Sequence, residues 1–390
     1  MNPIDTLPEL SGLKRTALMV GVVGVLATLA GAFLDPAQFF RSYLMGWIYW
    51  TGLGLGCLGI LMVYHLTGGG WGVAVKRLLE AGIGTLPVMA VLFVPLLFGL
   101  HDLYEWTHTE TVMADHVLRQ KVAYLNVPFF IVRAAIYFAA WLTLGYFLLR
   151  WSRQQDESDD PRLADWLRKL SGGGILLFGL VTTFAAFDWI MSLEPHWFST
   201  IFGLIFIGSQ ALGAMAFVIL AAYLLSAREL FARVFARSIL NDLGNLLLAF
   251  VMVYAYLSFS QFLIIWSANL PEEIPWYLHR ISGGWHLIVI ALAVFYFFVP
   301  FLVLLGRRNK QLHRRLATIA GGILVARVLE VFFLIGPAFY KDLLSAHWLD
   351  LAALAGVGGV WVSLFVWRLG MRPVLAAGDP ELAPALARQH

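Results

Sequence analysis

Long apolar runs recur along the whole chain, and each is long enough to cross a lipid bilayer. A membrane-spanning helix needs about 20 consecutive, mostly apolar residues. The sequence predicts ten such helices, at about residues 14–34, 42–66, 81–101, 128–150, 171–191, 200–225, 240–266, 282–306, 316–337 and 349–370. The predicted fold class is therefore an all-α integral membrane protein with ten transmembrane helices.

The composition excludes a soluble globular domain. Of the 390 residues, 60% are hydrophobic and 13% are charged, whereas a soluble domain is about 45–50% apolar and about 25% charged. The net charge of +3 gives no indication of a nucleic-acid partner. With Cys57 as its one cysteine, the chain alone cannot hold an iron–sulfur cluster or a covalently attached c-type haem.

Basic residues are distributed unevenly between the two sides of the predicted membrane domain. Of the 27 lysines and arginines, a small minority fall on one side: Arg41, Arg119, Lys121, Arg280 and Lys341. Cytoplasmic loops carry an excess of Lys and Arg, so we expect both termini in the cytoplasm and the chain in the cytoplasmic (inner) membrane. The tail after Met371, rich in Ala and Pro, is expected to be mobile.

Two parts of the chain resemble each other. Aligning Ser42 with Ser199 matches Gly46 with Gly203, and Gly-Gly-Ile-Leu occurs at both 173–176 and 321–324. The matches predict a parallel repeat of two four-helix bundles, helices 2–5 and 6–9, flanked by helices 1 and 10. The corresponding units are 1–41 (N-terminal segment and helix 1), 42–198 (first bundle), 199–340 (second bundle) and 341–390 (helix 10 and cytoplasmic tail).

Two charged residues lie deep inside the ninth predicted span. Arg327 is about 17 Å into a hydrocarbon core about 30 Å thick. Glu330 follows three residues later, on the same helix face. A charge at the bilayer centre costs about 2.5–3.5 kcal/mol on insertion scales, so such residues face the protein interior or water. Arg327 and Glu330 are either a self-neutralising structural pair or a station on a proton path.

A second polar group gathers near the outer ends of helices 3, 4 and 5. An apolar cleft with a proton acceptor and a route to water would suit quinol oxidation. The quinol-binding candidates are His101, Asp102, Arg133 and Asp188. The alternative is an ion-pair cluster at the membrane interface. The outer loop 101–127 carries His101, His108 and His116, whose spacing could suggest a metal. We instead expect a solvated loop that docks a partner, and no metal site.

Other polar residues could extend a proton path toward either surface. The repeat register places His286 opposite Arg133, and the inner helix ends carry further titratable groups, which could equally be ordinary solvated residues. With Arg327 and Glu330, the proton-path candidates are His286, Glu194, His196, Tyr254, Tyr256, Ser260, His65, Glu80 and Asp242.

Three stretches of the sequence resemble a known family. They are Phe187-Asp188-Trp189-Ile190-Met191-Ser192-Leu193-Glu194-Pro195-His196-Trp197-Phe198-Ser199-Thr200, Tyr124-Leu125-Asn126-Val127-Pro128-Phe129-Phe130 with Arg133, and His65-Leu66-Thr67-Gly68-Gly69. They are similar to the membrane subunits of alternative complex III, a quinol:cytochrome c oxidoreductase, which belong to the polysulfide-reductase-type (NrfD-like) family. The likeness covers nearly the whole chain and is greatest to the shorter of the two such subunits.

The resemblance implies partners that carry the redox chemistry. These are a second NrfD-like membrane subunit, an iron–sulfur protein, and multihaem and monohaem c-type cytochromes. It also implies that this subunit supports quinol oxidation, either by conducting protons or by binding a quinone (menaquinone or ubiquinone). The haems and iron–sulfur clusters would then lie on partner subunits. Two alternatives stay open: a stand-alone ion or solute carrier, and a passive scaffold subunit of the same complex.

Overall fold

The computed structural model describes residues 8–158, 160–225, 235, 237–341, 343–373, 376 and 378–382, and these residues form helices and no strands. Within them, ten helices are long and apolar enough to cross a membrane. The predicted all-α class and the ten spans are therefore confirmed, and the architecture is that of a multi-pass membrane protein. The internal repeat of two bundles stays a prediction.

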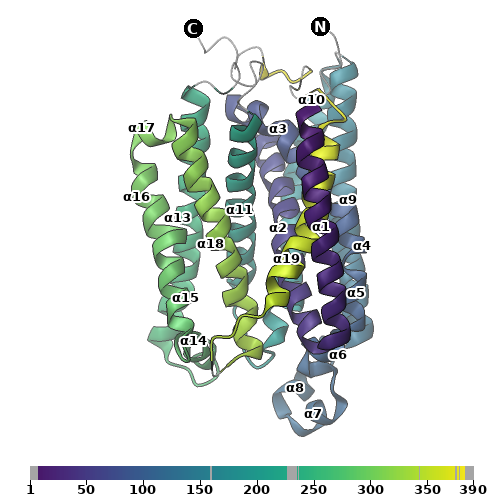
Figure 1. Ribbon diagram of the computed structural model, residues 1–390, viewed down its shortest axis with the longest axis vertical. Helices are drawn as coiled ribbons and strands as arrows, with labels where there is room; N and C mark the ends of the chain where they lie inside the picture. Colours follow the sequence, from purple (N-terminus) through teal and green to yellow (C-terminus); the bar gives the residue numbers. More distant parts are fainter. Residues whose placement is uncertain are drawn as a thin grey trace.

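The helices run along one long axis (Figure 1). The spans are α1 (Pro8–Leu34), α2 (Pro36–Thr67), α3–α5 (Gly70–Ile83, Leu86–Val91, Val94–Phe98), α9 (Val127–Glu157), α10 (Arg162–Trp189), α11 (Phe202–Leu225), α13 (Arg237–Ala268), α15–η3–α16 (Trp285–Leu292, Ala293–Phe298, Val299–Leu305), α18 (His313–Phe339) and α19 (Trp348–Leu369).

The first turn of α1 and the last turn of α19 lie at the same end of the molecule, here called the terminal end (Figure 1). The opposite end, here called the loop end, holds several short helices. These are α6 (Leu100–Leu103), η1 (Glu105–Thr107), α7 (Thr109–Ala114), α8 (His116–Lys121), η2 (Met191–Leu193) and α14 (Pro275–Ile281). The remaining short helix, α17 (Arg307–Lys310), lies at the terminal end (Figure 1).

The third span begins earlier than the sequence indicated, and it is bent. Residues 70–80, expected in a loop, form most of α3, which starts directly after a turn at Gly68 and Gly69, both with positive φ. The span is interrupted after Ile83 and again after Val91. Pro87 and Pro95 follow these two residues by four positions, where a proline lacks the N–H that would bond back and its ring crowds that carbonyl. The earlier start places charged residues inside a packed helix.

Helix α2 forms the centre of the fold. Of its apolar window, 83% is buried, against 17% in α13 and in the α15–α16 span. It packs against α1, α3, α10, α11, α18 and α19. Polar groups that face α2 are therefore enclosed by protein, whereas much of the surface of α13 and α15–α16 faces outward.

Helices α1 and α19 approach each other at backbone contact. A methyl group on Gly24 would lie 2.4 Å from the Gly356 nitrogen, and one on Gly359 would lie 2.2 Å from the Gly21 Cα. Small residues at such spacing allow helices to pack closely in a membrane, where no hydrophobic force draws them together.

Replacing Gly359 by leucine should separate α1 from α19. Overpacking a close contact typically costs about 1–3 kcal/mol, so we expect Gly359→Leu to lower the thermal stability of the purified protein. The matched control is Gly179→Leu in α10, where a methyl group would have nothing within 4 Å. Equal melting temperatures for the two variants would contradict a close contact between α1 and α19 at Gly359.

Candidate functional site

A buried polar centre lies where α18 meets α11. Arg327 is 0% exposed and Glu330 is 1% exposed. The Arg327 Nη1 donates to the carbonyl and to the hydroxyl of Ser209, each at 2.5 Å, and its Nη2 donates to Gln210 Oε1 at 2.7 Å. The Ser209 hydroxyl in turn donates to Glu330 Oε2 at 2.9 Å. Because Arg327 Nη1 and Glu330 Oε2 are 3.9 Å apart, Ser209 is the hydroxyl bridge between the two charges.

Glycines on α2 and α11 provide the room for this centre. A methyl group on Gly52 would lie 1.7 Å from Gln210 Oε1 and 2.5 Å from Arg327 Nη2. One on Gly213 would lie 2.6 Å from Arg327 Cδ. Any side chain at either position would displace the guanidinium or its partner, so the arginine and the two glycines form one packing unit.

Tyrosines surround the carboxyl group of Glu330. The hydroxyl of Tyr254, on α13, lies 3.5 Å from Glu330 Oε1. Its ring packs edge-on against Tyr296, with ring centroids 4.9 Å apart. The ring of Tyr49 lies 5.7 Å from the guanidinium carbon of Arg327. These rings enclose the charges in protein; the Tyr254 hydroxyl faces Glu330, whereas the Tyr49 hydroxyl donates to the carbonyl of Leu324 at 3.1 Å.

Tyr296 lies in a π-helical segment, residues Ala293–Phe298, within the eighth span. Pro300 follows four residues after Tyr296 and cannot donate to its carbonyl, which explains a break in regular helix at this point. π-Helical turns are frequent at functional sites. Sequence reasoning missed Tyr296, Ser209 and Gln210, although Pro300 inside an apolar run is a readable signal of an irregular helix.

The polar centre keeps unused hydrogen-bonding capacity. Among the described residues, Gln210 Nε2 is buried without a hydrogen-bond partner. The side chain of Tyr296 interacts with Arg327 and Ser209, and that of Ser258 interacts with Tyr254. Unsatisfied buried groups are rare in native proteins and call for an explanation such as ordered water or a functional role. The centre therefore contains more polar groups than its ion pair alone.

Arg133 and Asp188 form a separate ion pair near the loop end, in which each guanidinium nitrogen donates a hydrogen bond. Arg133 Nε and Nη2 donate to the two Asp188 oxygens at 2.7 and 2.9 Å, and Tyr137 donates to Asp188 Oδ2 at 2.7 Å. The remaining Arg133 Nη1 donates to the carbonyl of Tyr124 at 2.8 Å, and the guanidinium lies over the Tyr124 ring. The two charged side chains neutralise each other, and their hydrogen bonds hold α9 against α10.

His101 and Asp102 do not contact this pair, and both are exposed at the loop end. The four quinol-binding candidates therefore do not form one cluster, and a role of any of them in binding quinol stays a prediction. The His101 ring packs at a tilt against His108, with centroids 3.8 Å apart. Among the described residues, no group of three or more His, Cys, Asp or Glu side chains is arranged to hold a metal.

Glu194 joins the loop after α10 to α14, and its place on a proton path stays a prediction. It pairs with Arg280 Nη2 at 2.7 Å. Arg280 also donates to the carbonyl of Phe333 at 3.2 Å. This carbonyl has no helical partner, because Pro337, four residues later in α18, has no N–H to donate to it. Burial alone would raise the pKa of Glu194, but the Arg280 charge and hydrogen bonds from His279 and Arg280 lower it overall. A carboxylate held ionised in this way is an anchor for α14.

His196 lies outside the buried centre and contacts another loop. It is exposed, and its Nε2 lies 2.7 Å from Asp115 Oδ2. The hydrogen bond from His196, with backbone N–H groups of α8, lowers the pKa of Asp115 to about 2. The pair joins the loop after α10 to the turn between α7 and α8.

Four further proton-path candidates lie away from the buried centre. Tyr256 is 69% exposed, and His286 and Asp242 are exposed as well. Residues two apart on a helix point in nearly opposite directions, so α13 turns Tyr254 inward and Tyr256 outward. Ser260 follows Tyr256 by four residues and so shares its face of α13, whereas Ser258 and Gln261 share the face of Tyr254.

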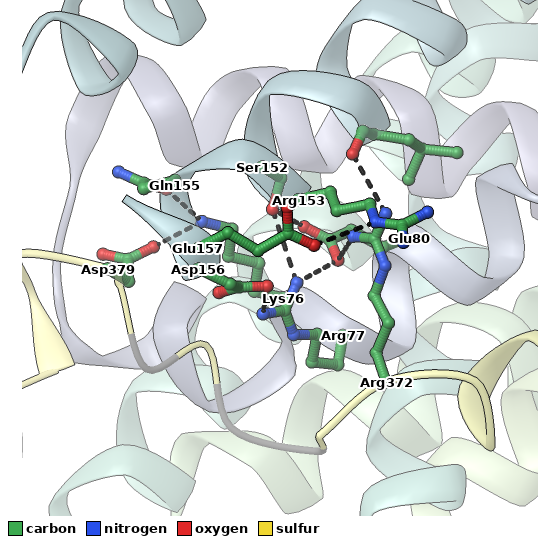
Figure 2. Close-up of polar contacts among 11 residues, drawn as sticks. Lys76, Arg77, Glu80, Ser152, Arg153, Gln155, Asp156, Glu157, Arg372 and Asp379 are labelled. Carbon is green, nitrogen blue, oxygen red and sulfur yellow. Dashed lines mark hydrogen bonds and ion pairs between the residues drawn. The ribbon is translucent and has the colours of Figure 1, made fainter. Parts of the chain in front are cut away.

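The last two candidates, Glu80 and His65, lie at the terminal end. Figure 2 shows Glu80 within a charged cluster formed by α3, α9 and the tail. Glu80 accepts from Arg77 Nη1 at 2.6 Å and from the Ser152 hydroxyl, and Arg372 Nη1 lies 3.5 Å away. His65 lines a cavity of about 410 Å³ between the end of α2, the start of α10 and the tail. Its Nε2 is buried and has no hydrogen-bond partner among the described residues.

No protein-family model matches the sequence, and a search of curated proteins finds no match.

Removing one member of the Arg133–Asp188 pair should be strongly destabilising. Breaking a buried ion pair from one side costs about 3–5 kcal/mol because the other charge is left uncompensated. We expect Asp188→Leu and Arg133→Met each to lower the thermal stability of the purified protein markedly. The double variant should be more stable than either single one. If each single variant has the melting temperature of the parent, the Arg133–Asp188 pair does not stabilise the packing of α9 against α10.

Proposed function

We propose that this chain is a membrane subunit of a quinol-oxidising electron-transfer complex of the alternative complex III type, and that the Arg327–Glu330 centre conducts protons. The observation that carries the proposal is a carboxyl group, 1% exposed, in the middle of a span. It is bridged by Ser209 to an arginine and faces a tyrosine hydroxyl. The resemblance of three stretches of the sequence to NrfD-like membrane subunits supports the assignment to this class of complex.

The chemistry of the centre suits proton transfer. Glu330 can bind a proton and release it, and the hydroxyls of Ser209 and Tyr254 can pass it on, because each is both a donor and an acceptor. Arg327 stabilises the ionised carboxylate without titrating itself. Ionisable groups inside spans commonly mark ion and proton pathways.

In the proposed complex, the redox centres belong to partner subunits. These are an iron–sulfur protein, multihaem and monohaem c-type cytochromes, and a second NrfD-like subunit. The excess of basic residues at the terminal end supports a cytoplasmic position for both termini. The loop end, with η1, α7 and α8 projecting from it (Figure 1), would then face the partners that accept electrons.

For the Arg133–Asp188 pair, the geometry favours a scaffold role over quinol binding. Asp188 is 0% exposed, and both of its carboxylate oxygens accept hydrogen bonds from Arg133. A quinol hydroxyl would have to break this pair in order to reach an acceptor. This geometry supports a scaffold role for this part of the molecule, whereas we propose proton conduction for the centre at Glu330.

Replacing Glu330 by glutamine should abolish proton translocation by the assembled complex. Glutamine keeps the shape of the side chain but cannot carry a proton between neighbours. The measurement is proton translocation per electron in reconstituted vesicles, with quinol turnover recorded in the same sample. We expect a loss of translocation while the complex still assembles with its haem-bearing partners.

The control is Glu272→Gln, which changes an exposed carboxylate at the loop end. Unchanged translocation in Glu330→Gln, at normal turnover, would remove Glu330 from the path. Purification of the chain as a lone protein that moves a solute into liposomes would overturn the assignment to a complex.

A further inference from the structure

A small pocket at the terminal end is lined by three arginines, Arg77, Arg368 and Arg372, and is called the arginine pocket below. It lies between α3, Leu149 of α9 and the end of α19 with the residues that follow it, and its volume is about 60 Å³. One water molecule needs about 10–15 Å³ of such space, so the pocket has room for a tetrahedral oxyanion. Arg368 and Met371, which both line the pocket, are exposed, so it opens at the surface of the molecule.

Two carboxylates neutralise two of these arginines. Glu80 Oε2 accepts from Arg77 Nη1 at 2.6 Å, and Arg372 Nη1 lies 3.5 Å from the same oxygen. Arg77 Nη2 donates to Asp156 (Figure 2). The other end of the Arg372 fork, Nη2, donates to the carbonyl of Leu149 at 3.2 Å, which fixes the guanidinium against α9.

Arg368 is the third cation, and among the described residues no carboxylate pairs with it. A methyl group on Gly84 would lie 3.0 Å from Arg368 Cγ, so the stem of this side chain lies on the end of α3. Its guanidinium carbon lies 5.1 Å from the centroid of the Trp367 ring. The three arginines of the pocket therefore carry one positive charge in excess of the two carboxylates beside them.

Two of the arginines keep a capacity to bind an anion. Arg77 is 5% exposed, and its Nε is buried without a hydrogen-bond partner among the described residues. Burial lowers the pKa of Arg372; Glu80 opposes this effect, and the Arg77 charge adds to it. A guanidinium presents its N–H groups in a planar fork that matches the oxygens of a phosphate. An oxyanion in the pocket would therefore stabilise the charged form of these side chains.

The surroundings of the pocket favour a ligand that is charged at one end and apolar at the other. Trp367 is 42% exposed and Met371 is 58% exposed, and they flank Arg368 along the chain. Tryptophan is enriched where lipid headgroups meet the acyl chains. Basic pockets between transmembrane helices are typical binding sites for anionic lipid headgroups. The place of the pocket, at the last turn of a span, is thus suited to a lipid.

We propose that the arginine pocket binds a phosphate oxyanion, and that its source is the headgroup of an anionic phospholipid in the leaflet at the terminal end. The arginines hold the phosphate oxygens, and Trp367 and Met371 provide apolar surface for the acyl chains. The bound lipid joins α3, α9 and α19 at this end of the molecule. This site belongs to the chain itself and does not depend on the function proposed above.

Native mass spectrometry of the full chain in detergent micelles tests the site. Titration with phosphatidylglycerol gives the affinity of the tightest lipid, and zwitterionic phosphatidylcholine is the comparison. We expect tighter binding of phosphatidylglycerol. Arg368→Gln should weaken that binding about tenfold or more, because hydrogen bonds to charged groups are among the stronger ones. Since Arg368 is exposed, the variant should keep the parent's melting temperature without added lipid.

The matched control is Arg150→Gln. Arg150 is also exposed, but it donates to the Tyr146 hydroxyl at 3.0 Å and does not line the pocket. Its removal takes the same charge from the same end of the molecule and should leave the lipid affinity unchanged. Equal affinities in the parent and in Arg368→Gln would overturn the site, as would an equal loss in Arg150→Gln or equal affinities for the two lipids.

Inorganic phosphate distinguishes the two sources of the oxyanion. Added in excess, it should leave phosphatidylglycerol bound to the parent, because free phosphate has no acyl chains to contact Trp367 and Met371. Displacement of the lipid by inorganic phosphate would overturn a lipid as the ligand of the arginine pocket.

Discussion

The fold depends on keeping one cation inside a layer of apolar helices. Arg327 is fully buried, and a charge in that position is tolerated only with close partners. Its partners come from α11, and its space comes from glycines on α2 and α11. Arg327 therefore joins α18 to α11 at a point where α2 leaves room for it, and α2 is the most buried of the ten spans.

The buried charges of this chain differ in how completely they are satisfied. Asp188 takes three hydrogen bonds from side chains of 2.9 Å or less, and each guanidinium nitrogen of its partner Arg133 donates one hydrogen bond. Glu330 has one bond of 2.9 Å and a longer contact from Tyr254, and its arginine lies 3.9 Å away. The close contacts of Asp188 are typical of a pair that stabilises one arrangement of helices. The fewer contacts of Glu330 are the reason that we propose proton exchange there.

Hydropathy was sufficient to predict the spans and to single out Arg327 and Glu330, because an apolar run and the charges inside it are both visible within one stretch of sequence. Partners such as Ser209 and Tyr296 depend on how neighbouring helices are rotated, which a single sequence does not specify. Two features were not predicted from the apolar run: α3 begins before it, and His101 lies exposed and apart from Arg133. The tail was predicted to be mobile from its composition, whereas Asp379 is 7% exposed and pairs with Lys76.

The proposed function requires that Glu330 change its protonation state while quinol is oxidised. Infrared difference spectroscopy of the assembled complex, recorded between its oxidised and reduced states, measures this directly. We expect a carboxyl band that shifts in heavy water and is missing in Glu330→Gln, while Glu272→Gln retains it. Difference spectra that are identical in the parent and in Glu330→Gln would rule out this change and leave the Arg327–Glu330 centre a structural one.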